Sequence, residues 1–480
     1  MKAACLPLLF FLPAALAADT ARFAPAHRLT GVGVGRDDLS LEELATRTDR
    51  MIAAQTFAIM REPQALPGAR RITGNLKLQA LFRSAALASG FPERVLEAIA
   101  YLESWGDPKA ESPAGPRGIM QVSAATAATM GLKITYARRY RLARERVAVR
   151  TRRGRTTWRT VTRKIPYRAL LRDERLLPER AIPAAARYLA GMEQKFGGRD
   201  WAIFAYHCGQ GCIGMLQDVA RHSHGIPAAQ MTVAGVFFAN NPAWNRDLFE
   251  ALQQQMQRDY SPTYWFRVMR AAQLLDLYRR DPEEFTQLAA EYKSEFVAAN
   301  ARAPHRLSVW LKKEDLVYRS GEDIRAGLGN GLVRALDRPA WFGYTLQLDG
   351  DSASEASPAA VGTLIYVAFE TRRLFDEMHP RGARFEPLAV TSLVQPEDSL
   401  RLKGRPEALT HCSGQVFDID YSALPPAELE CLRFVLSDLG WEGYLGFVEE
   451  GMDSLHIGSA PAARDFFTAV FQDAVSRSED

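Results

Sequence analysis

The sequence predicts a multidomain protein, mainly α-helical in its N-terminal half and α+β in its C-terminal part. The chain has 480 residues, enough for two or three domains, and 47% of them are hydrophobic, which can support real cores. Apolar residues recur at helical spacing up to about residue 296. After Pro304, alternating apolar residues and Gly/Ser/Asp turns predict short strands with helices between them.

The first eighteen residues have the composition of a secretory signal peptide. Lys2 gives a charged start, residues 6–12 an apolar centre, and residues 15–17 a small-residue cleavage site. The apolar part is too short to span a bilayer, and no later run of eighteen apolar residues occurs. We therefore expect a protein exported to the periplasm that is not an integral membrane protein.

The cysteines that follow this segment are even in number: Cys208, Cys212, Cys412 and Cys431. In an exported chain an even number suggests disulfides, and the grouping along the sequence would pair Cys208 with Cys212 and Cys412 with Cys431. Free buried thiols are the alternative.

Helices account for most of the N-terminal half. Residues 19–74 form an extension with one helix from about Leu41 to Arg61, which ends before Pro63. Helical spacing then runs from Leu76 to Leu132, over residues 173–220, and from about Asn245 to Phe296. The expected domains are a helical module at 75–220 and a helical extension at 221–303.

A basic insertion, residues 138–172, interrupts the helical module. It holds fourteen Arg or Lys and one acid, which leaves the rest of the chain net acidic although the whole carries +4. Residues 146–163 predict a hairpin that turns at Arg153 and Gly154. Pairing about that turn places Arg146, Arg150, Arg152, Arg155 and Arg159 on one face, and Val147, Val149, Thr151, Thr156, Trp158 and Thr160 on the other. The basic ridge is either solvated or binds an anionic polymer.

The C-terminal part begins with a strand-rich connector at residues 304–359, within which 349–360 has the composition of a linker or loop tip. An α+β domain is expected over residues 360–475. Its pattern is a helix at 359–378, strands near 385–394 and 414–421, a helix at 425–440, and strands at 443–450 and 454–459.

The helical module contains one carboxylate in a notable position. Glu103 and Ser104 end an apolar helix beside a Gly/Pro-rich loop, and such a carboxylate is either a solvated helix end or a general acid. The loop reads Ser-Pro-Ala-Gly-Pro-Arg-Gly-Ile-Met-Gln over residues 112–121. A Thr-Ala pair follows at residues 126–127, and Tyr206 stands far downstream in "FAYHCGQG".

These separated elements resemble, in order and spacing, the soluble lytic transglycosylase family, which is related in fold to goose-type lysozyme. The family pattern is Glu-Ser at a helix end, Ser-x-x-Gly-x-x-Gly-(Leu/Ile)-Met-Gln, a Thr-Ala helix, and Ala-Tyr-Asn-x-Gly. The resemblance covers about residues 75–220. It implies a lysozyme-like module that needs no cofactor and cleaves the bond between N-acetylmuramic acid (MurNAc) and N-acetylglucosamine (GlcNAc) in peptidoglycan.

The resemblance also implies roles for individual residues. Glu103 would be the catalytic acid, which protonates the glycosidic oxygen and then helps the C6 hydroxyl of MurNAc attack its own C1, giving a 1,6-anhydro sugar. An apolar setting keeps such a carboxyl protonated. His207 departs from the family's Asn, and its charge would change near neutral pH. The implied substrate-binding residues are Ser104, Ser112, Gly118, Met120, Gln121, Tyr206 and His207.

In the C-terminal domain, His411, Asp418 and His456 have the composition of a metal site. Two histidines and one carboxylate with an open position suit a catalytic zinc ion. The spacing His-x-x-Gly-x-x-x-Asp, followed by a later His on a strand, resembles zinc D-alanyl-D-alanine carboxypeptidases and their relatives over about residues 360–470. The resemblance implies a zinc-peptidase-like module.

Two positions depart from that second family. Its substrate-binding Arg is Gln395 here, and its general base, normally Glu three residues before the last His, is Asp453. Glu449 and Glu450 are nearby alternatives for the base. An active peptidase with altered specificity and a domain that binds metal or peptide without cutting both remain open.

The sequence therefore indicates an exported two-module peptidoglycan enzyme, a lytic transglycosylase whose C-terminal module cuts or binds the peptide stems. The alternatives are a non-catalytic cell-wall scaffold and a hydrolysing lysozyme-type glycosidase. Peptidoglycan is the expected partner, together with other anionic envelope polymers at the Arg-rich hairpin, and nucleic acid is not expected.

Overall fold

The computed structural model describes residues 40–150, 154–222, 226, 230–258, 263–292, 317–379, 382–402, 406–450 and 453–479. The signal peptide expected over residues 1–18 lies outside these residues. The chain divides into two compact units. The helical unit comprises Pro63–Tyr206 and Ala271–Thr286, and the mixed unit comprises the described parts of Met1–Glu62, His207–Arg270 and Gln287–Asp480.

The helical unit forms where the apolar spacing predicts helices. Its elements are α3 (Ala65–Gly74), α4 (Leu76–Ser89), α5 (Glu93–Ser104), α6 (Ala124–Thr129), β1 (Ile134–Arg150), β2 (Thr156–Asp173), η1 (Glu174–Leu176) and α7 (Pro178–Phe196). The division between the units falls inside α8 (Arg199–Cys208), α12 (Tyr264–Arg280) and α13 (Pro282–Glu291). α5 carries the core of this unit, because Leu96, Ala98, Ile99 and Tyr101 are all fully buried on it.

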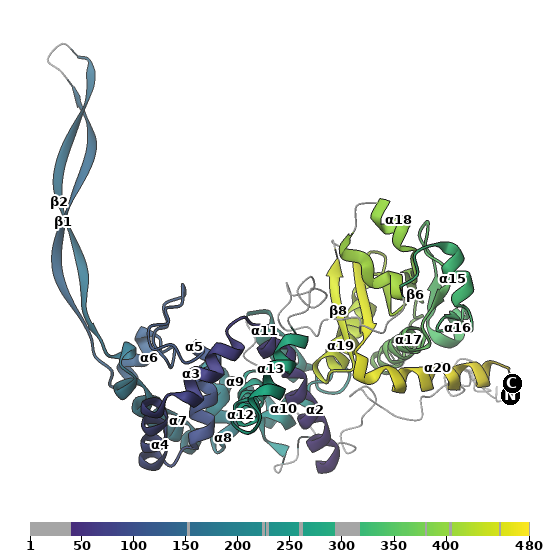
Figure 1. The fold of residues 1–480 in the computed structure, drawn as a ribbon, viewed down its shortest axis with the longest axis horizontal. Helices are drawn as coiled ribbons and strands as arrows, with labels where there is room; N and C mark the ends of the chain where they lie inside the picture. Colours follow the sequence, from purple (N-terminus) through teal and green to yellow (C-terminus); the bar gives the residue numbers. More distant parts are fainter. Residues whose placement is uncertain are drawn as a thin grey trace, which may run out of the picture. The chain divides into compact units, whose positions relative to one another are not determined.

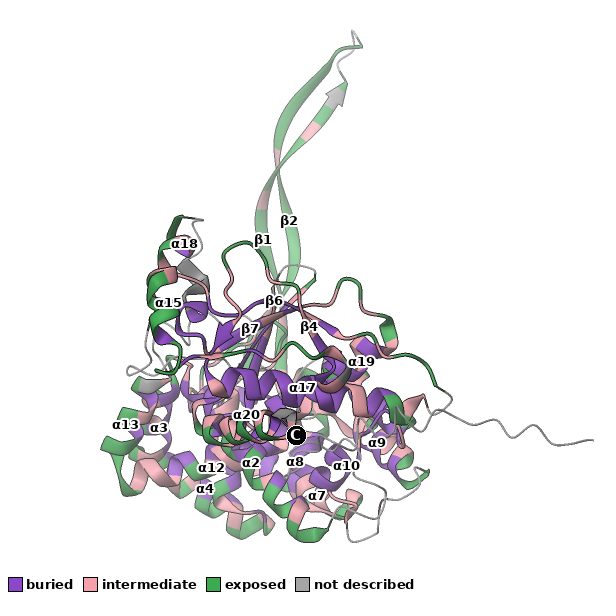
Figure 2. Cartoon of the chain, turned by 90° about the vertical axis from the view of Figure 1, so that its right-hand side faces the viewer, coloured by how far each residue is buried: buried purple, intermediate pink, exposed green. Residues whose placement is uncertain are grey.

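The basic insertion forms the long antiparallel hairpin β1–β2, drawn as a twisted two-stranded ribbon in Figure 1 and exposed along nearly its whole length in Figure 2. The expected division into one basic and one Val/Thr/Trp face is wrong. The strands pair Val147 with Arg159 and Ala148 with Trp158. Directly paired residues share a face, so Val147 and Trp158 lie on opposite faces and cations occur on both.

The mixed unit combines helices from both ends of the chain with a sheet. Its helices are α2 (Leu41–Met60), α9 (Gln210–His222), α10 (Val233–Phe238), α11 (Arg246–Arg258), α15 (Gly321–Gly327), α16 (Pro339–Phe342), α17 (Pro358–Met378), α18 (Glu397–Leu402), η4 (Pro406–Ser413), α19 (Pro426–Trp441), η5 (Pro461–Ala463) and α20 (Arg464–Glu479). Its strands are β3 (Val333–Arg334), β4 (Tyr344–Leu346), β5 (Glu355–Ala356), β6 (Leu388–Ser392), β7 (Val416–Asp420), β8 (Leu445–Glu450) and β9 (Ser454–Ser459).

Five of these strands form one sheet in the order β4-β6-β7-β9-β8, antiparallel except for the β4–β6 pair. α17 packs against this sheet with α19 and α20 beside it, and Figure 2 shows it buried along most of its length. α17 and α20 approach closely at Gly362, where a Cβ would lie 1.8 Å from the Phe467 carbonyl oxygen. The α+β pattern expected for the C-terminal region is therefore present.

The connector expected to be strand-rich contains the short strands β3, β4 and β5. Residues 306–316 of its first strand candidate lie outside the described residues, and the rest contains α15 instead. Ser320 and Asp323 explain this helix, because each side chain accepts a hydrogen bond from the other's backbone amide. The expected linker at 349–360 ends in strand β5 and in the first turn of α17, which Ser357 caps.

The expected disulfides are absent, since the structure has Cys208, Cys212, Cys412 and Cys431 as thiols. Cys431 lies in the main core, with its sulfur 3.6 Å from that of Met378 on α17, whereas Cys412 lies on η4. Burial raises the pKa of the Cys431 thiol to about 12 and that of Cys412 to about 11. None of the helices within the described residues has the length and apolar composition that crossing a bilayer requires.

A buried ionic cluster joins α2 to α19 inside the mixed unit. The Arg47 guanidinium lies 2.8 Å from a carboxylate oxygen of Asp438 and 2.6 Å from one of Glu442. Burial raises the pKa of Glu442 to about 8, because the attraction of Arg47 does not offset the loss of water and Asp438 adds a like charge.

This shifted pKa predicts a pH-dependent stability. Between pH 4.5, the ordinary value for Glu442, and pH 8 the folded chain binds more protons than the unfolded chain, so stability falls as the pH rises through this window. We expect the melting temperature of the Glu442→Gln variant to fall less from pH 5 to pH 8 than that of the wild type. The exposed Glu322→Gln variant should keep the wild-type profile. Parallel profiles for wild type and Glu442→Gln would show that Glu442 is ionised throughout.

Candidate functional site

Glu103 occupies the last turn of α5, where the helix meets the Gly/Pro-rich loop. Its side chain is partly buried, and the following residue, Ser104, is buried and hydrogen-bonded to two carbonyls, those of Ala100 (3.0 Å) and Ile119 (2.8 Å). The second bond attaches the loop to the helix end. The backbone that carries Glu103 is therefore held beside the loop.

Backbone strain gathers around this helix end. Among the described residues, two that are not glycine have positive φ, Trp105 at 53° and Gln121 at 44°. Arg71 donates to the Trp105 carbonyl at 2.7 Å, and the Gln121 side-chain amide donates to the carbonyls of Ala110 and Gly118. Such conformations persist where surrounding contacts impose them, and they are frequent at functional sites.

The loop residues that the sequence singled out contribute mainly backbone groups. Met120 is fully buried, and its carbonyl accepts a 2.7 Å hydrogen bond from the Tyr206 hydroxyl on α8. Gly118 has φ of 80°, and a Cβ there would lie 1.8 Å from the Arg175 carbonyl oxygen. Ser112 is partly buried, and its hydroxyl accepts from the Ala114 amide at 3.3 Å.

Tyr206 lies within the electrostatic field of Glu103. Burial raises the pKa of Tyr206 well above its ordinary value, and the negative charge of Glu103 and the nearby Tyr188 raise it further. The rings of Tyr188 and Tyr206 meet edge to face, with centroids 6.3 Å apart. The structure thus groups Glu103, Ser104, the loop and Tyr206, and it adds Tyr188, which the sequence reasoning had missed.

Arg175 also holds this loop, although no sequence motif marks it. Its guanidinium, 4% exposed, binds both oxygens of Asp173 (2.9 and 2.7 Å) and donates to the carbonyls of Gly115 (3.2 Å) and Val122 (3.1 Å). Burial alone would raise the pKa of Asp173, but its hydrogen bonds with Arg175 hold that pKa below its ordinary value. Asp173 is the last residue of β2 and also lies 3.8 Å from Arg117 of the loop. The hairpin root is therefore joined to the loop through Asp173 and Arg175.

His207 belongs to the mixed unit, whereas Glu103 and Tyr206 belong to the helical unit. Its exposed ring packs against Tyr264 with centroids 4.7 Å apart. At the position where the resembled family has Asn, this chain therefore has a histidine whose ring contacts Tyr264.

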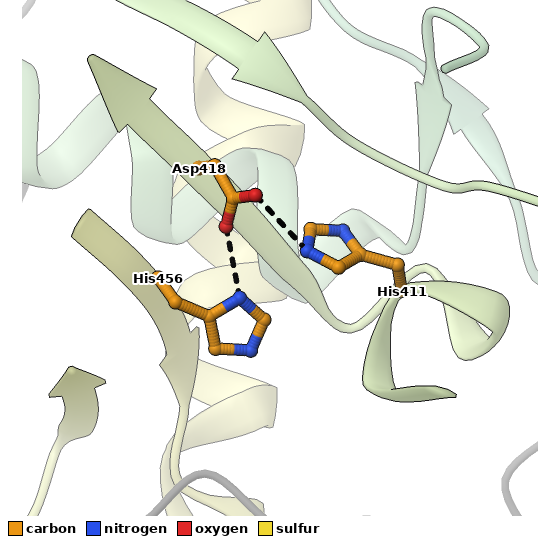
Figure 3. Close-up of side chains that lie close together, drawn as sticks. All are labelled: His411, Asp418 and His456. Atoms are coloured by element: carbon orange, nitrogen blue, oxygen red, sulfur yellow. Dashed lines mark hydrogen bonds and ion pairs between the residues drawn. The ribbon is translucent and has the colours of Figure 1, made fainter. Parts of the chain in front are cut away.

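The three metal-ligand candidates of the C-terminal region converge. Asp418 on β7 and His456 on β9 are directly opposite in the sheet register, and His411 approaches from η4 (Figure 3). One carboxylate oxygen lies 3.2 Å from Nε2 of His411, and the other lies 2.8 Å from Nδ1 of His456. Both histidines are buried, and potential ligand atoms of all three residues lie within 4.8 Å of one another.

In each histidine, the ring nitrogen that does not face Asp418 has its own hydrogen-bond partner, and these partners indicate that the group suits a cation. Nδ1 of His411 lies 2.8 Å from the Leu393 carbonyl, which can only accept, so a proton on Nδ1 leaves a lone pair on Nε2 facing Asp418. Nε2 of His456 lies 3.1 Å from the Thr410 hydroxyl, which can accept a hydrogen bond from Nε2 and so leave a lone pair on Nδ1. Lone pairs and a carboxylate that face one another are satisfied by a proton or by a metal ion between them. A divalent metal fits this donor set, and the outer partners orient the ligands.

Of the two positions that depart from the carboxypeptidase pattern, Gln395 is linked to the cluster, whereas the Asp453 side chain is exposed. The Gln395 side chain donates to the Ser392 hydroxyl at 2.8 Å, and that hydroxyl lies 3.2 Å from Nδ1 of His411, so Gln395 is linked to the cluster. Asp453 is exposed before β9, and its carbonyl accepts from the Tyr421 amide. The alternative base Glu449 pairs with Arg433 at 3.4 Å, and the side chain of Glu450 lies outside the described residues.

Replacing Arg175 tests whether its bonds to Asp173, Gly115 and Val122 hold the loop in place. Arg175→Met removes the bidentate ion pair of the buried Asp173 carboxylate and the side-chain bonds to the carbonyls of Gly115 and Val122. It should therefore lower the free energy of unfolding by about 3 kcal/mol. Trypsin should also cut faster after Arg117, inside the loop. The exposed Arg180→Met on α7 is the matched control and should change neither quantity. Unchanged unfolding and proteolysis in Arg175→Met would mean that the loop holds its shape without these bonds.

Comparison with known proteins agrees with this geometry. Residues 80–145 and 156–224 match the family model of the Transglycosylase SLT domain, so the match includes Glu103, the loop and Tyr206 and omits the hairpin tip. A 138-residue stretch is 35% identical to the "Peptidoglycan transglycosylase gp16" of Escherichia phage T7, which is 28% of this chain and 8% of that relative's length. The His411–Asp418–His456 cluster lies outside the residues matched by the family model. The chain thus contains an SLT transglycosylase domain at residues 80–224.

Proposed function

We propose that the chain is an exported peptidoglycan lytic transglycosylase, which cleaves the MurNAc–GlcNAc bond and leaves 1,6-anhydroMurNAc ends. The observation that carries this proposal is the placement of Glu103 at a helix end that is closed by a strained loop and Tyr206. The SLT match and the similarity to a phage peptidoglycan transglycosylase support the same reaction. Export to the periplasm rests on the composition of residues 1–18.

In this proposal Glu103 acts twice. Its carboxyl group first donates a proton to the glycosidic oxygen as the bond from that oxygen to C1 of MurNAc breaks. The resulting carboxylate then accepts the proton of the C6 hydroxyl while that oxygen forms a bond to C1. The first proton stays on the released GlcNAc hydroxyl, and the proton of the C6 hydroxyl restores the acid form of Glu103. The cycle therefore consumes no water and needs one carboxyl group instead of the usual two.

The neighbours of Glu103 suit a residue that changes charge during the cycle. Because the pKa of Tyr206 is raised, its phenol keeps its proton and continues to donate to the Met120 carbonyl whether Glu103 is charged or neutral. The Ser104 hydroxyl donates to the carbonyls of Ala100 on the helix and Ile119 in the loop. The loop therefore stays attached to both helices through both steps.

The binding of a zinc ion at His411, Asp418 and His456 is a second proposed function, and the convergence of these ligands favours it. When bound, zinc supplies a Lewis acid that polarises a peptide carbonyl and activates a water molecule. The chain's own residues orient the ligands, through the Leu393 carbonyl and the Thr410 hydroxyl. We propose that this module acts on the stem peptides of the same polymer or binds them.

Glu103→Gln tests the first proposal. The amide keeps the shape of the side chain but cannot transfer a proton, so release of anhydro-muropeptides from purified peptidoglycan should fall at least about a hundredfold. Glu179→Gln, an exposed glutamate on α7, is the control and should release them at the wild-type rate. Mass spectrometry of the digest reports the outcome.

Three results of that digest would contradict the transglycosylase proposal. Undiminished release by folded Glu103→Gln would remove Glu103 from the reaction. Reducing ends in place of anhydro ends would identify a hydrolysing glycosidase. No cleavage by the wild type would favour the alternative that the chain is a non-catalytic cell-wall scaffold.

His411→Ala tests the metal proposal. The wild type should copurify with, or take up on titration, about one zinc per chain, and the variant should lose it because two ligands hold zinc poorly. The exposed His222→Ala on α9 is the control and should keep the metal. Loss of zinc should leave the Glu103 activity intact and abolish any stem-peptide cleavage. A wild type that takes up no zinc would reject the site, and zinc without peptide cleavage would indicate a binding module.

A further inference from the structure

The register of β1–β2 gives the hairpin two unlike faces. From residue 136 to residue 170, even-numbered residues of both strands share one face and odd-numbered residues share the other. Within the described strands β1 and β2, the even face carries six cations and no acid: Arg138, Arg144, Arg146, Arg150, Lys164 and Arg168. The odd face carries four cations, Arg139, Arg141, Arg159 and Arg163, of which the last pairs with Glu145 at 3.6 Å.

The even face also exposes large aromatic and aliphatic side chains. Tyr140 is 57% exposed, Leu142 71% and Trp158 62%. Guanidinium groups lie over tyrosine rings on this face, that of Arg138 5.7 Å from the Tyr140 centroid and that of Arg168 4.5 Å from the Tyr136 centroid. The odd face exposes fewer large side chains, Ile165 at 38% and Tyr167 at 42%. It also carries small, partly buried residues: Ala137, Ala143, Val147, Val161 and Ala169.

This arrangement is unfavourable for the hairpin alone. A two-stranded ribbon that exposes its side chains gains little from burial. Arg138 and Arg168 are directly opposite on the even face, and like charges in that position destabilise a strand pair. An anionic ligand on the even face would neutralise this repulsion and cover the exposed rings, and charge complementarity therefore selects a polyanion.

The twisted shape of the ribbon favours one kind of polyanion, a flexible linear polymer, over a flat lipid surface. The two strands coil around each other along their length in Figure 1, as two-stranded ribbons do. The even face therefore winds around the hairpin axis, and only part of it can touch a flat lipid surface at once. A flexible linear polymer can follow the winding face.

We propose that the even face of β1–β2 is a substrate-binding surface, which engages the free carboxylates of the stem peptides of peptidoglycan. The proposal rests on the proposed function for its choice of polymer. The hairpin root supports it, because Asp173 at the end of β2 holds Arg175, and Arg175 holds the loop beside Glu103. The surface and the cleavage site thus belong to one connected part of the helical unit.

The test compares two triple variants with the same change in net charge, both in the full chain carrying Glu103→Gln so that the polymer is not cut. R138Q/R144Q/R146Q alters the even face, and R139Q/R141Q/R159Q alters the odd face. Binding to purified sacculi at low salt should weaken by roughly tenfold or more for the even-face variant, and should stay within about threefold of the parent for the odd-face variant. At about 1 M salt the three proteins should bind alike.

Two controls separate charge from folding and identify the ligand. The charge-conserving R138K/R144K/R146K variant should restore most of the binding, which would exclude a misfolded hairpin as the cause of the loss. Sacculi whose carboxylates have been coupled to methylamine should bind the parent as weakly as native sacculi bind the even-face variant.

Equal losses from both faces, or undiminished binding to the amidated sacculi, would overturn the proposal. Tighter binding to phosphatidylglycerol vesicles or to DNA than to sacculi would assign the even face to another class of partner. Failure of the proposed function is separately visible, because it appears as missing anhydro products while the binding difference between the two faces remains.

Discussion

The attachment of the 110–122 loop to the end of α5 is the constraint on which the proposed glycan chemistry depends. Ser104 at the end of α5, Tyr206 of α8 and Arg175 of η1 bond to carbonyl oxygens of this loop, and Gln121 braces it from within. Carbonyls cannot titrate, so the loop keeps its shape when the charge of Glu103 changes. Positive φ at Trp105 and Gln121 is the cost of the attachment, and the hydrogen bonds around them offset it.

The metal candidate rests on a different constraint, the register of an antiparallel sheet. Side chains alternate between faces along β7 and β9, so Phe417 and Ile419 pack into the helix-covered core while Asp418 lies on the other face, opposite His456. A slip of one residue would exchange these faces, and the apolar core forbids it. The same pattern that buries the core thus fixes the distance between two ligands, and η4 supplies the third.

The sequence was sufficient for the helices and for the C-terminal sheet, because apolar spacing of long elements is a strong signal. It also singled out Glu103, which lies beside the loop, and three metal-ligand candidates that converge, since their residue types and spacing carry chemistry. It failed for the hairpin faces, because no buried face fixes the register of an exposed ribbon. It failed for Arg175 and Tyr188, because partners distant in sequence determine their roles, and for the cysteines, whose even number says nothing of where their sulfurs lie.

The central claim is that Glu103 directs the C6 hydroxyl of MurNAc, and not water, onto C1. Cleavage of purified peptidoglycan in water enriched in oxygen-18 tests it directly, by mass spectrometry of the new glycan ends. Intramolecular attack places no solvent oxygen on C1, so the ends should be anhydro and unlabelled. Reducing ends that carry oxygen-18 would show that water is the nucleophile and would contradict the account.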